Sequence, residues 1–291
     1  MEENFNNQLI KESDIINVTN IKGIAGKSVA SMIMSAFKYN KINEIYHKNK
    51  SLDGYEFTNA VIEDIDIKYE LSELDLCRIP KAGSFIIVSN HPFGGLEALI
   101  LFKELQIIRN DLKAIGNFLF HKIEPLKGFI FPVNPFESHK EEKSSISALK
   151  DALKHLEKGK PLLIFPAGEV STYYPESTGI SDRKWMKQAI KFIKRAKVPV
   201  VPVYFQGSNS RAFHALGFIH PLLRTAKIPS ELLNKKNKTI NIRIGNPISV
   251  REQQEYPEVE RFGRFLRTKT YLLGTNLEAK KFFLILMRLL I

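Results

Sequence analysis

From residue 84 onward, short apolar runs alternate with segments whose apolar residues recur at helical spacing. The apolar runs predict buried strands over 84–90, 112–116, 128–134, 161–168, 198–207 and 238–247. The segments between them predict helices over 97–111, 144–158 and 183–197, and a final helix over about 257–273. This alternation is typical of βαβ units. We therefore expect an α/β fold with a mostly parallel central sheet flanked by helices.

The N-terminal part of the chain has a different pattern. Residues 1–20 are polar and rich in asparagine, and residues 26–48 carry apolar side chains near helical spacing with lysines between them. The second stretch predicts one or two amphipathic helices, which either pack on the main domain or lie on a membrane surface. We expect residues 1–70 to form a polar tail and a helical extension, and residues 71–275 to form one catalytic domain.

The last part, residues 276–291, is basic and apolar. Its apolar run "KKFFLILMRLLI" is too short to span a bilayer, so it either lies in the membrane surface or packs as a terminal helix. The sequence contains no run of eighteen apolar residues and no secretory pattern. Together these features predict a peripheral protein on the cytoplasmic face of the cell membrane.

Charge narrows the range of partners. Lysine and arginine exceed aspartate and glutamate by 43 to 31, which gives a net charge of +12. Such a surface favours an anionic membrane surface, an acidic carrier protein or nucleic acid, although a soluble surface with extra lysines remains an alternative. No zinc spacing and no glycine-aromatic RNA-binding motif occurs, so nucleic acid is not expected. A single cysteine, Cys77, excludes an intrachain disulfide, and the histidines show no metal-ligand spacing.

The stretch "SNHPFGGLEAL" is the first candidate for chemistry. His91 directly follows a predicted strand, and ligands bind at the carboxyl ends of parallel strands. Gly94 and Gly95 permit a tight turn, and Glu97 falls in the first turn of the next predicted helix. The loop could therefore place an imidazole beside a carboxylate, with His91 as a general base. A structural histidine and a glutamate that only complements the helix dipole are the alternatives.

Four ordered blocks at predicted strand ends resemble the glycerophospholipid acyltransferase family. They are Asn90-His91 followed by Glu97, "GFIFPVN" at 128–134, "FPAGEVS" at 165–171 and "VPVVPVYF" at 198–205. The resemblance covers about residues 80–250 and implies transfer of an acyl group from a thioester to a hydroxyl. It also implies the glycerolipid acyltransferase type of α/β fold. By this resemblance His91 is the catalytic base and Glu97 orients it.

The departures from the family pattern concern the acceptor. Five residues separate His91 from Glu97 where the family has four, and the acid is glutamate instead of aspartate. The family arginines of the second and third blocks are replaced by Asn134 and Val170. Because a phosphate would lose its bidentate partners there, these losses argue against a phosphate-bearing acceptor.

The same variants resemble a hemolysin-like bacterial branch that completes ornithine or glycine lipids. The implied acceptor is an N-(3-hydroxyacyl) amino acid, whose 3-hydroxyl receives the second acyl chain. No bound cofactor is expected, and the co-substrate would be acyl carrier protein or coenzyme A carrying the acyl thioester. Lysophosphatidic acid acylation is the near alternative, with Lys184 or Arg211 replacing the lost arginines. A non-catalytic basic membrane-binding module is the alternative from another class.

Substrate binding is predicted for a set of loop residues. Asn134 would hydrogen-bond the acceptor, amides around Gly168 would position donor or acceptor, and Glu169 would contact the amine of ornithine. Ser208, Asn209 and Arg211 would hold a carboxylate or the donor phosphates, unless they only form a polar turn before a helix. The whole predicted set is Asn90, Gly94, Gly95, Asn134, Phe165, Pro166, Gly168, Glu169, Ser208, Asn209 and Arg211.

Overall fold

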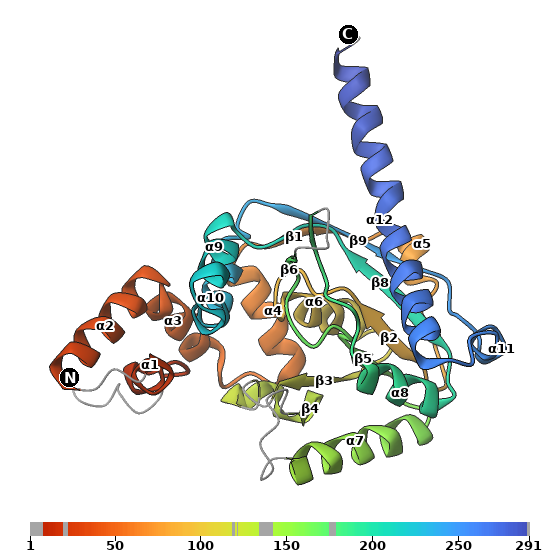
Figure 1. Cartoon of the computed structure of the whole chain (residues 1–291), viewed down its shortest axis with the longest axis horizontal. Coiled ribbons are helices and arrows are strands. Elements are labelled where there is room, and N and C mark those ends of the chain that lie inside the picture. Colours follow the sequence, from red (N-terminus) through yellow and green to blue (C-terminus); the bar gives the residue numbers. More distant parts are fainter. Residues whose placement is uncertain are drawn as a thin grey trace.

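The centre of the molecule is a mostly parallel β-sheet. The computed structural model describes residues 8–19, 23–117, 120, 122–133, 142–174 and 179–289. In this part of the chain the main sheet has seven strands in the order β1-β9-β8-β2-β5-β3-β4 (Figure 1). The strands are β1 (Lys68–Glu70), β2 (Ile86–Ser89), β3 (Lys113–Asn117), β4 (Ile130–Val133), β5 (Leu162–Ile164), β8 (Val200–Phe205) and β9 (Thr239–Ile244).

Strand direction in this sheet agrees with the expected fold class. Strands β8, β2, β5, β3 and β4 are parallel neighbours, whereas β9 runs antiparallel to β8 and pairs in parallel with β1. The prediction of a mostly parallel sheet flanked by helices is therefore confirmed. Since β2 lies between β8 and β5, the loop after β2 is central at the carboxyl edge.

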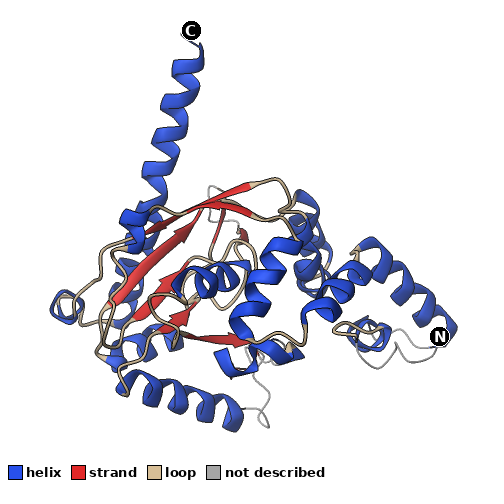
Figure 2. Ribbon diagram, turned by 180° about the vertical axis from the view of Figure 1, so that it is seen from behind, coloured by secondary structure: helices blue, strands red, loops and turns tan. Residues whose placement is uncertain are grey.

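Helices cover both faces of the sheet (Figure 2). Helices α4 (Gly54–Asp64) and α6 (Leu96–Leu105) pack on one face, in a core that includes Ile87 of β2. Helices α7 (Glu142–Glu157), α8 (Lys187–Ala196) and α12 (Val259–Leu289) pack on the other, against Ile86 and Val88. Because neighbouring strand residues point to opposite faces, a strand buried on both sides is mostly apolar, as Ile86, Ile87 and Val88 of β2 are.

Three helices extend from one side of the sheet (Figure 1). They are α1 (Glu12–Thr19), α2 (Gly23–Ala36) and α3 (Tyr39–Asn49), and the last two correspond to the amphipathic helices expected over 26–48. Ile15, Ala30, Met34 and Tyr39 form a small core of their own. The Tyr39 hydroxyl also donates to the Ala226 carbonyl of α10 (Pro221–Leu233), so α3 is joined to the main body.

Several elements differ from the predicted ones. The helix expected from residue 183 begins at Lys187, because 183–186 form a loop in which Trp185 is buried and bonded to Asp182. The final helix α12 continues to Leu289, across the boundary drawn at 275, and its far end extends away from the sheet in Figure 1. Elements that the pattern did not predict are α1, α4, β1, α5 (Glu73–Leu76), η3 (Glu124–Phe129), β6 (Thr172–Tyr173), β7 (Ile180–Ser181), α9 (Arg211–Ile219), α10 and α11 (Val250–Gln254).

None of the helices within the described residues combines the length and the apolar character needed to cross a membrane.

Candidate active site

His91 lies in the loop between β2 and α6, at the carboxyl edge of the sheet. Its ring stacks on Phe165, which follows β5, with centroids 4.3 Å apart and planes inclined by 28°. Its backbone is fixed on both sides, since Ser171 N donates to His91 O at 2.9 Å and His91 N donates to Asp182 Oδ1 at 3.1 Å. The loops after β2 and β5 therefore meet at this histidine, as the topology of a parallel sheet requires.

Glu97 is fully buried at the start of α6. Its carboxylate accepts the backbone amides of Phe93 at 2.6 Å, Gly94 at 3.4 Å and Gly95 at 2.9 Å. Its Oε1 atom lies 3.5 Å from His91 Nδ1, within ion-pair distance but longer than a good hydrogen bond. The sequence interpretation of an imidazole beside a carboxylate is thus what the structure shows.

Two glycines form the turn between His91 and Glu97. Gly94 and Gly95 have φ angles of +90° and +130°, which side chains with a Cβ rarely adopt. A Cβ atom on Gly94 would lie 2.8 Å from Ile228 and 3.0 Å from Val170. The tight turn expected from "GG" is therefore required both by backbone conformation and by close packing.

The two charges of this pair stabilise each other. Burial on its own lowers the pKa of His91, but attraction to Glu97 and to Asp182 outweighs burial, so the pKa is raised. Burial on its own raises the pKa of Glu97, but the nearby imidazole and the Phe93 amide outweigh it, so the pKa is lowered. Glu97 is consequently an anion at neutral pH, and it makes His91 a stronger base than an isolated buried imidazole.

A second buried carboxylate, Asp182, supports the site and was missed from the sequence. Besides His91 N, it accepts the Ser171 hydroxyl and, at 3.0 Å, the Trp185 indole N–H. Burial raises the pKa of Asp182 despite these hydrogen bonds. The contacts join positions 91, 171 and 182, which no local motif links, so only the fold reveals them.

Asn90 and Asn209 attach the His91 loop to neighbouring parts of the chain, namely β8 and the segment around Lys235. The Asn90 amide donates to Phe205 O at 2.9 Å and accepts Phe205 N at 2.8 Å, which ties the end of β2 to β8. The Asn209 amide donates to Phe93 O at 3.2 Å and accepts Lys235 Nζ at 2.8 Å. Both side chains are buried and form hydrogen bonds within the protein. Their predicted contact with substrate stays a prediction.

Lys235 belongs to a buried charged cluster behind the loop, which sequence reasoning also missed. Glu231 is fully buried and lies 3.5 Å from Lys235 and 3.4 Å from Lys227. It also accepts Ser210 N at 2.9 Å and the Ser210 hydroxyl at 2.7 Å. Lys235 Nζ lies 4.9 Å from the centre of the Phe93 ring. Through these contacts α10 and the start of α9 fix the loop that carries His91.

The third sequence block lies beside His91, with Glu169 at an arginine pair. Glu169 Oε2 lies 3.1 Å from Arg224 and its Oε1 lies 3.4 Å from Arg183. Gly168 has a φ angle of +70°, and its amide donates to Phe165 O at 3.1 Å, so that amide stabilises the turn. Val170 and Pro166 are buried. Glu169 therefore meets two cations of the chain itself, where sequence reasoning expected the amine of a substrate.

The remaining predicted residues are placed as follows. Ser208 and Arg211 are exposed, after β8 and at the start of α9, at the same edge of the sheet as His91. Asn134 lies outside the described residues. In the described part of the chain, no group of three or more His, Cys, Asp or Glu residues is placed to hold a metal ion.

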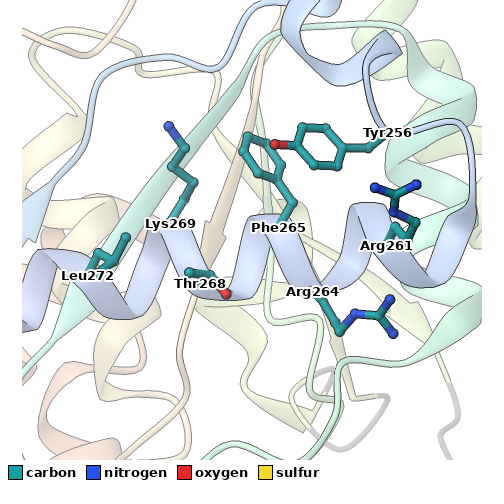
Figure 3. A pocket seen from close by; sticks show the side chains of 7 residues that line it. All are labelled: Tyr256, Arg261, Arg264, Phe265, Thr268, Lys269 and Leu272. Carbon is teal, nitrogen blue, oxygen red and sulfur yellow. The ribbon is translucent and has the colours of Figure 1, made fainter.

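A surface hollow of about 320 Å³ lies along α12 (Figure 3). The Tyr256 and Phe265 rings stack in it with centroids 4.0 Å apart. Arg267 and Tyr271 of the same helix bond to the backbone of Asp182. It is lined by Tyr256, Arg261, Arg264, Phe265, Thr268, Lys269 and Leu272.

Two curated proteins are similar in sequence to this chain. Two curated relatives are each named lyso-glycine lipid O-acyltransferase. The relative from Bacteroides thetaiotaomicron is 29% identical over 233 residues, which cover 76% of this chain and 81% of the relative. The relative from Phocaeicola vulgatus is 25% identical over 256 residues, which cover 84% of this chain and 87% of the relative.

A solved structure and a family model are also similar to this chain. The 1-acyl-sn-glycerophosphate acyltransferase PlsC from Thermotoga maritima matches 93% of each chain, with 17% identity and a TM-score of 0.46. The model of the acyltransferase family matches residues 21–280. The resemblance expected from four sequence blocks is thereby confirmed, and the chain belongs to the acyltransferase family and is an acyltransferase.

Proposed function

We propose that this enzyme moves a fatty acyl group from an acyl thioester to the 3-hydroxyl of an N-(3-hydroxyacyl) amino acid, with lyso-glycine lipid as the acceptor. The observation that carries the proposal is the pairing of His91 with the fully buried Glu97 at the carboxyl edge of the sheet. The acceptor is supported by the two curated relatives, each of which is named lyso-glycine lipid O-acyltransferase. It is also supported by the buried Val170, which supplies no charge where the family pattern has an arginine.

The proposed reaction uses His91 as a general base. Because Nδ1 faces Glu97, Nε2 is the atom that accepts the proton of the acceptor hydroxyl. The hydroxyl oxygen then forms a bond to the thioester carbonyl carbon, and the C–S bond breaks. The thiolate leaves and takes the proton from the imidazolium, which returns His91 to its neutral form. Glu97 stabilises the imidazolium while it exists.

The proposed donor is an acyl thioester of acyl carrier protein or of coenzyme A. Both carriers are strongly anionic, and the net charge of +12 attracts either of them. The same charge supports attachment to an anionic membrane surface, where a water-insoluble acceptor resides. The exposed basic side chains at the active edge include Arg211 at the start of α9.

The test offers the purified enzyme two acceptors, N-(3-hydroxypalmitoyl)glycine and lysophosphatidic acid, each with an acyl carrier protein donor and a coenzyme A donor. The expected product is the diacylated glycine, formed with a kcat/KM at least about tenfold above that for lysophosphatidic acid. His91→Ala is the control for catalysis by this site. Preferential formation of phosphatidic acid would overturn the assignment of an amino-acid acceptor while leaving the enzyme class intact.

A further inference from the structure

The proposed acceptor carries a carboxylate, and an enzyme that selects it needs a cation beside the His91 loop. Val170 supplies none, and Lys184 pairs instead with Glu260 at 3.5 Å on an exposed surface. Lys227 and Lys235 are both engaged by the buried Glu231. We propose that Arg224 binds the carboxylate of the acceptor and thereby determines its selection; this inference rests on the proposed function.

Helix α10 brings Arg224 to the correct edge of the sheet. Ile228 lies one turn further along α10 and borders Gly94, since a Cβ on that glycine would lie 2.8 Å from Ile228. Val170 also borders Gly94, at 3.0 Å from the same position. Arg224 itself reaches Glu169, the residue next to Val170, at 3.1 Å. The guanidinium therefore lies beside the loop after β5. Phe165 of this loop stacks on His91.

The charge around Arg224 suits one carboxylate. Arg224, Arg183 and the glutamate between them carry one net positive charge, which a single carboxylate neutralises. A guanidinium has five N–H donors in a planar fork, and the contact with Glu169 engages one of its nitrogens. The Arg224 side chain is only 17% exposed, so its interaction with an anion is less screened than that of Arg183, which is 66% exposed.

Glu169 has a defined place in this arrangement. It lies on the neighbouring loop and holds the long Arg224 side chain in place, which reduces the entropy lost when a carboxylate binds. Sequence reasoning treated Glu169 as the partner of a substrate amine. In the structure it pairs with arginine, so the substrate group that fits beside it is an anion.

The test compares two acceptors that differ only at the carboxylate: N-(3-hydroxypalmitoyl)glycine and the neutral N-(3-hydroxypalmitoyl)glycinamide. In Arg224→Gln we expect KM for the acid to rise about 10- to 100-fold, kcat to change less than about threefold, and transfer to the amide to change less than about twofold. Arg251→Gln, an exposed arginine on α11, is the matched control and should behave as the wild type with both acceptors.

The outcomes separate this inference from the function on which it rests. Equal losses with the acid and the amide in a folded Arg224→Gln would mean that Arg224 is only structural, and would overturn the inference. Arg224→Lys keeps the charge and is the second variant if Arg224→Gln does not fold. It should still prefer the acid, and equal transfer to both acceptors would again overturn the inference. A wild-type enzyme that acylates neither N-acyl acceptor would instead overturn the proposed function.

Discussion

Each carboxylate around His91 has its own task. The Glu97 Oε1 atom lies 3.5 Å from His91 Nδ1, and the carboxylate accepts hydrogen bonds from three backbone amides. Glu97 therefore fixes both the ring and the loop. Asp182 receives the backbone amide of His91 and is bonded to Ser171 and Trp185. In the proposed mechanism Glu97 raises the basicity of His91, and Asp182 holds the backbone that carries it.

The pH dependence of the rate follows from this pair. A general base acts in its neutral form, so kcat/KM should rise with pH through the raised pKa of His91. Glu97→Gln removes the attraction that raises this pKa, and burial then lowers it. The acid limb of the profile should therefore move to lower pH, and the maximal rate should fall.

The measurement is kcat/KM from about pH 5 to about pH 9 for the wild type and Glu97→Gln. Glu157→Gln, at the exposed end of α7, is the matched control and should leave the profile unchanged. An acid limb that stays in place in Glu97→Gln would show that Glu97 does not act on His91.

Local pattern revealed some residues of the site and not others. His91, Glu97 and the two glycines follow an apolar strand within one short stretch, so strand, turn and helix rules identify them. Asp182 and Arg224 act through contacts with residues 91 and 55 positions away. A buried arginine or aspartate has the same local pattern as an exposed one, which is why these contacts could not be predicted.

At the scale of elements, the strand–turn–helix unit that carries His91 depends on its glycines. Gly94→Ala would force a Cβ onto a residue with φ of +90°, 2.8 Å from Ile228. We expect a loss of at least about 1 kcal/mol in the free energy of unfolding, measured by chemical denaturation, together with a lower kcat. Gly128→Ala is the control, because no atom lies within 4 Å of its Cβ position. An equal effect of both substitutions would contradict this assignment.

Helix α10 is fastened to the site by the buried Glu231. Burial raises its pKa, but hydrogen bonds from Ser210 and the charges of Lys235 and Lys227 outweigh burial, so the pKa is lowered. The stabilisation is therefore present above the pKa of the unfolded chain and is lost as pH falls through the folded pKa. Glu231→Gln leaves two lysines without their anion, for which we expect a loss of about 3 kcal/mol at neutral pH.

Chemical denaturation of Glu231→Gln and the wild type as a function of pH tests this role. The difference in stability should shrink toward acidic pH, where Glu231 of the wild type is protonated. Glu255→Gln changes an exposed residue outside the cluster and should leave the stability unchanged. A difference that is constant with pH would show that the charge of Glu231 is not what stabilises α10.

Strands β2 and β5 were predictable because their residues are buried and, apart from Ser89 at the end of β2, apolar. Helix α10 and strands β6 and β7 lack such an apolar run and were not predicted. Helix α10 contains Pro229 and carries the buried polar residues Lys227, Ser230 and Glu231. Its inward face therefore lacks the apolar spacing by which a helix is predicted. The short strands β6 and β7 have two residues each, too few for a period to be visible.

At the scale of the whole molecule, one chain combines a basic surface with a site that takes an acyl donor. If the donor is acyl carrier protein, its KM should rise several-fold between about 50 mM and about 500 mM salt, because salt screens attraction between exposed charges. An uncharged acyl thioester of N-acetylcysteamine is the matched donor and should show little change. Parallel salt dependence for both donors would contradict electrostatic recruitment by the net charge of +12.

The long helix α12 connects the site with the outer part of the molecule. Arg267 donates to Asp182 O at 2.9 Å, and Asp182 N donates to the Tyr271 hydroxyl at 2.7 Å. From there α12 continues to Leu289, away from the sheet (Figure 1). The sequence pattern predicted the start of this helix but not its continuation, because Gly274 follows the predicted end and the pattern of apolar residues changes there.

The most direct measurement is the rate of ester formation on N-(3-hydroxypalmitoyl)glycine by the wild type and by His91→Ala. With the fold verified by thermal melting, His91→Ala should lose about 10²- to 10⁴-fold in kcat, because the general base is removed while the rest of the site remains. A folded His91→Ala within about threefold of the wild type would contradict catalysis by the His91–Glu97 pair and would place the base elsewhere.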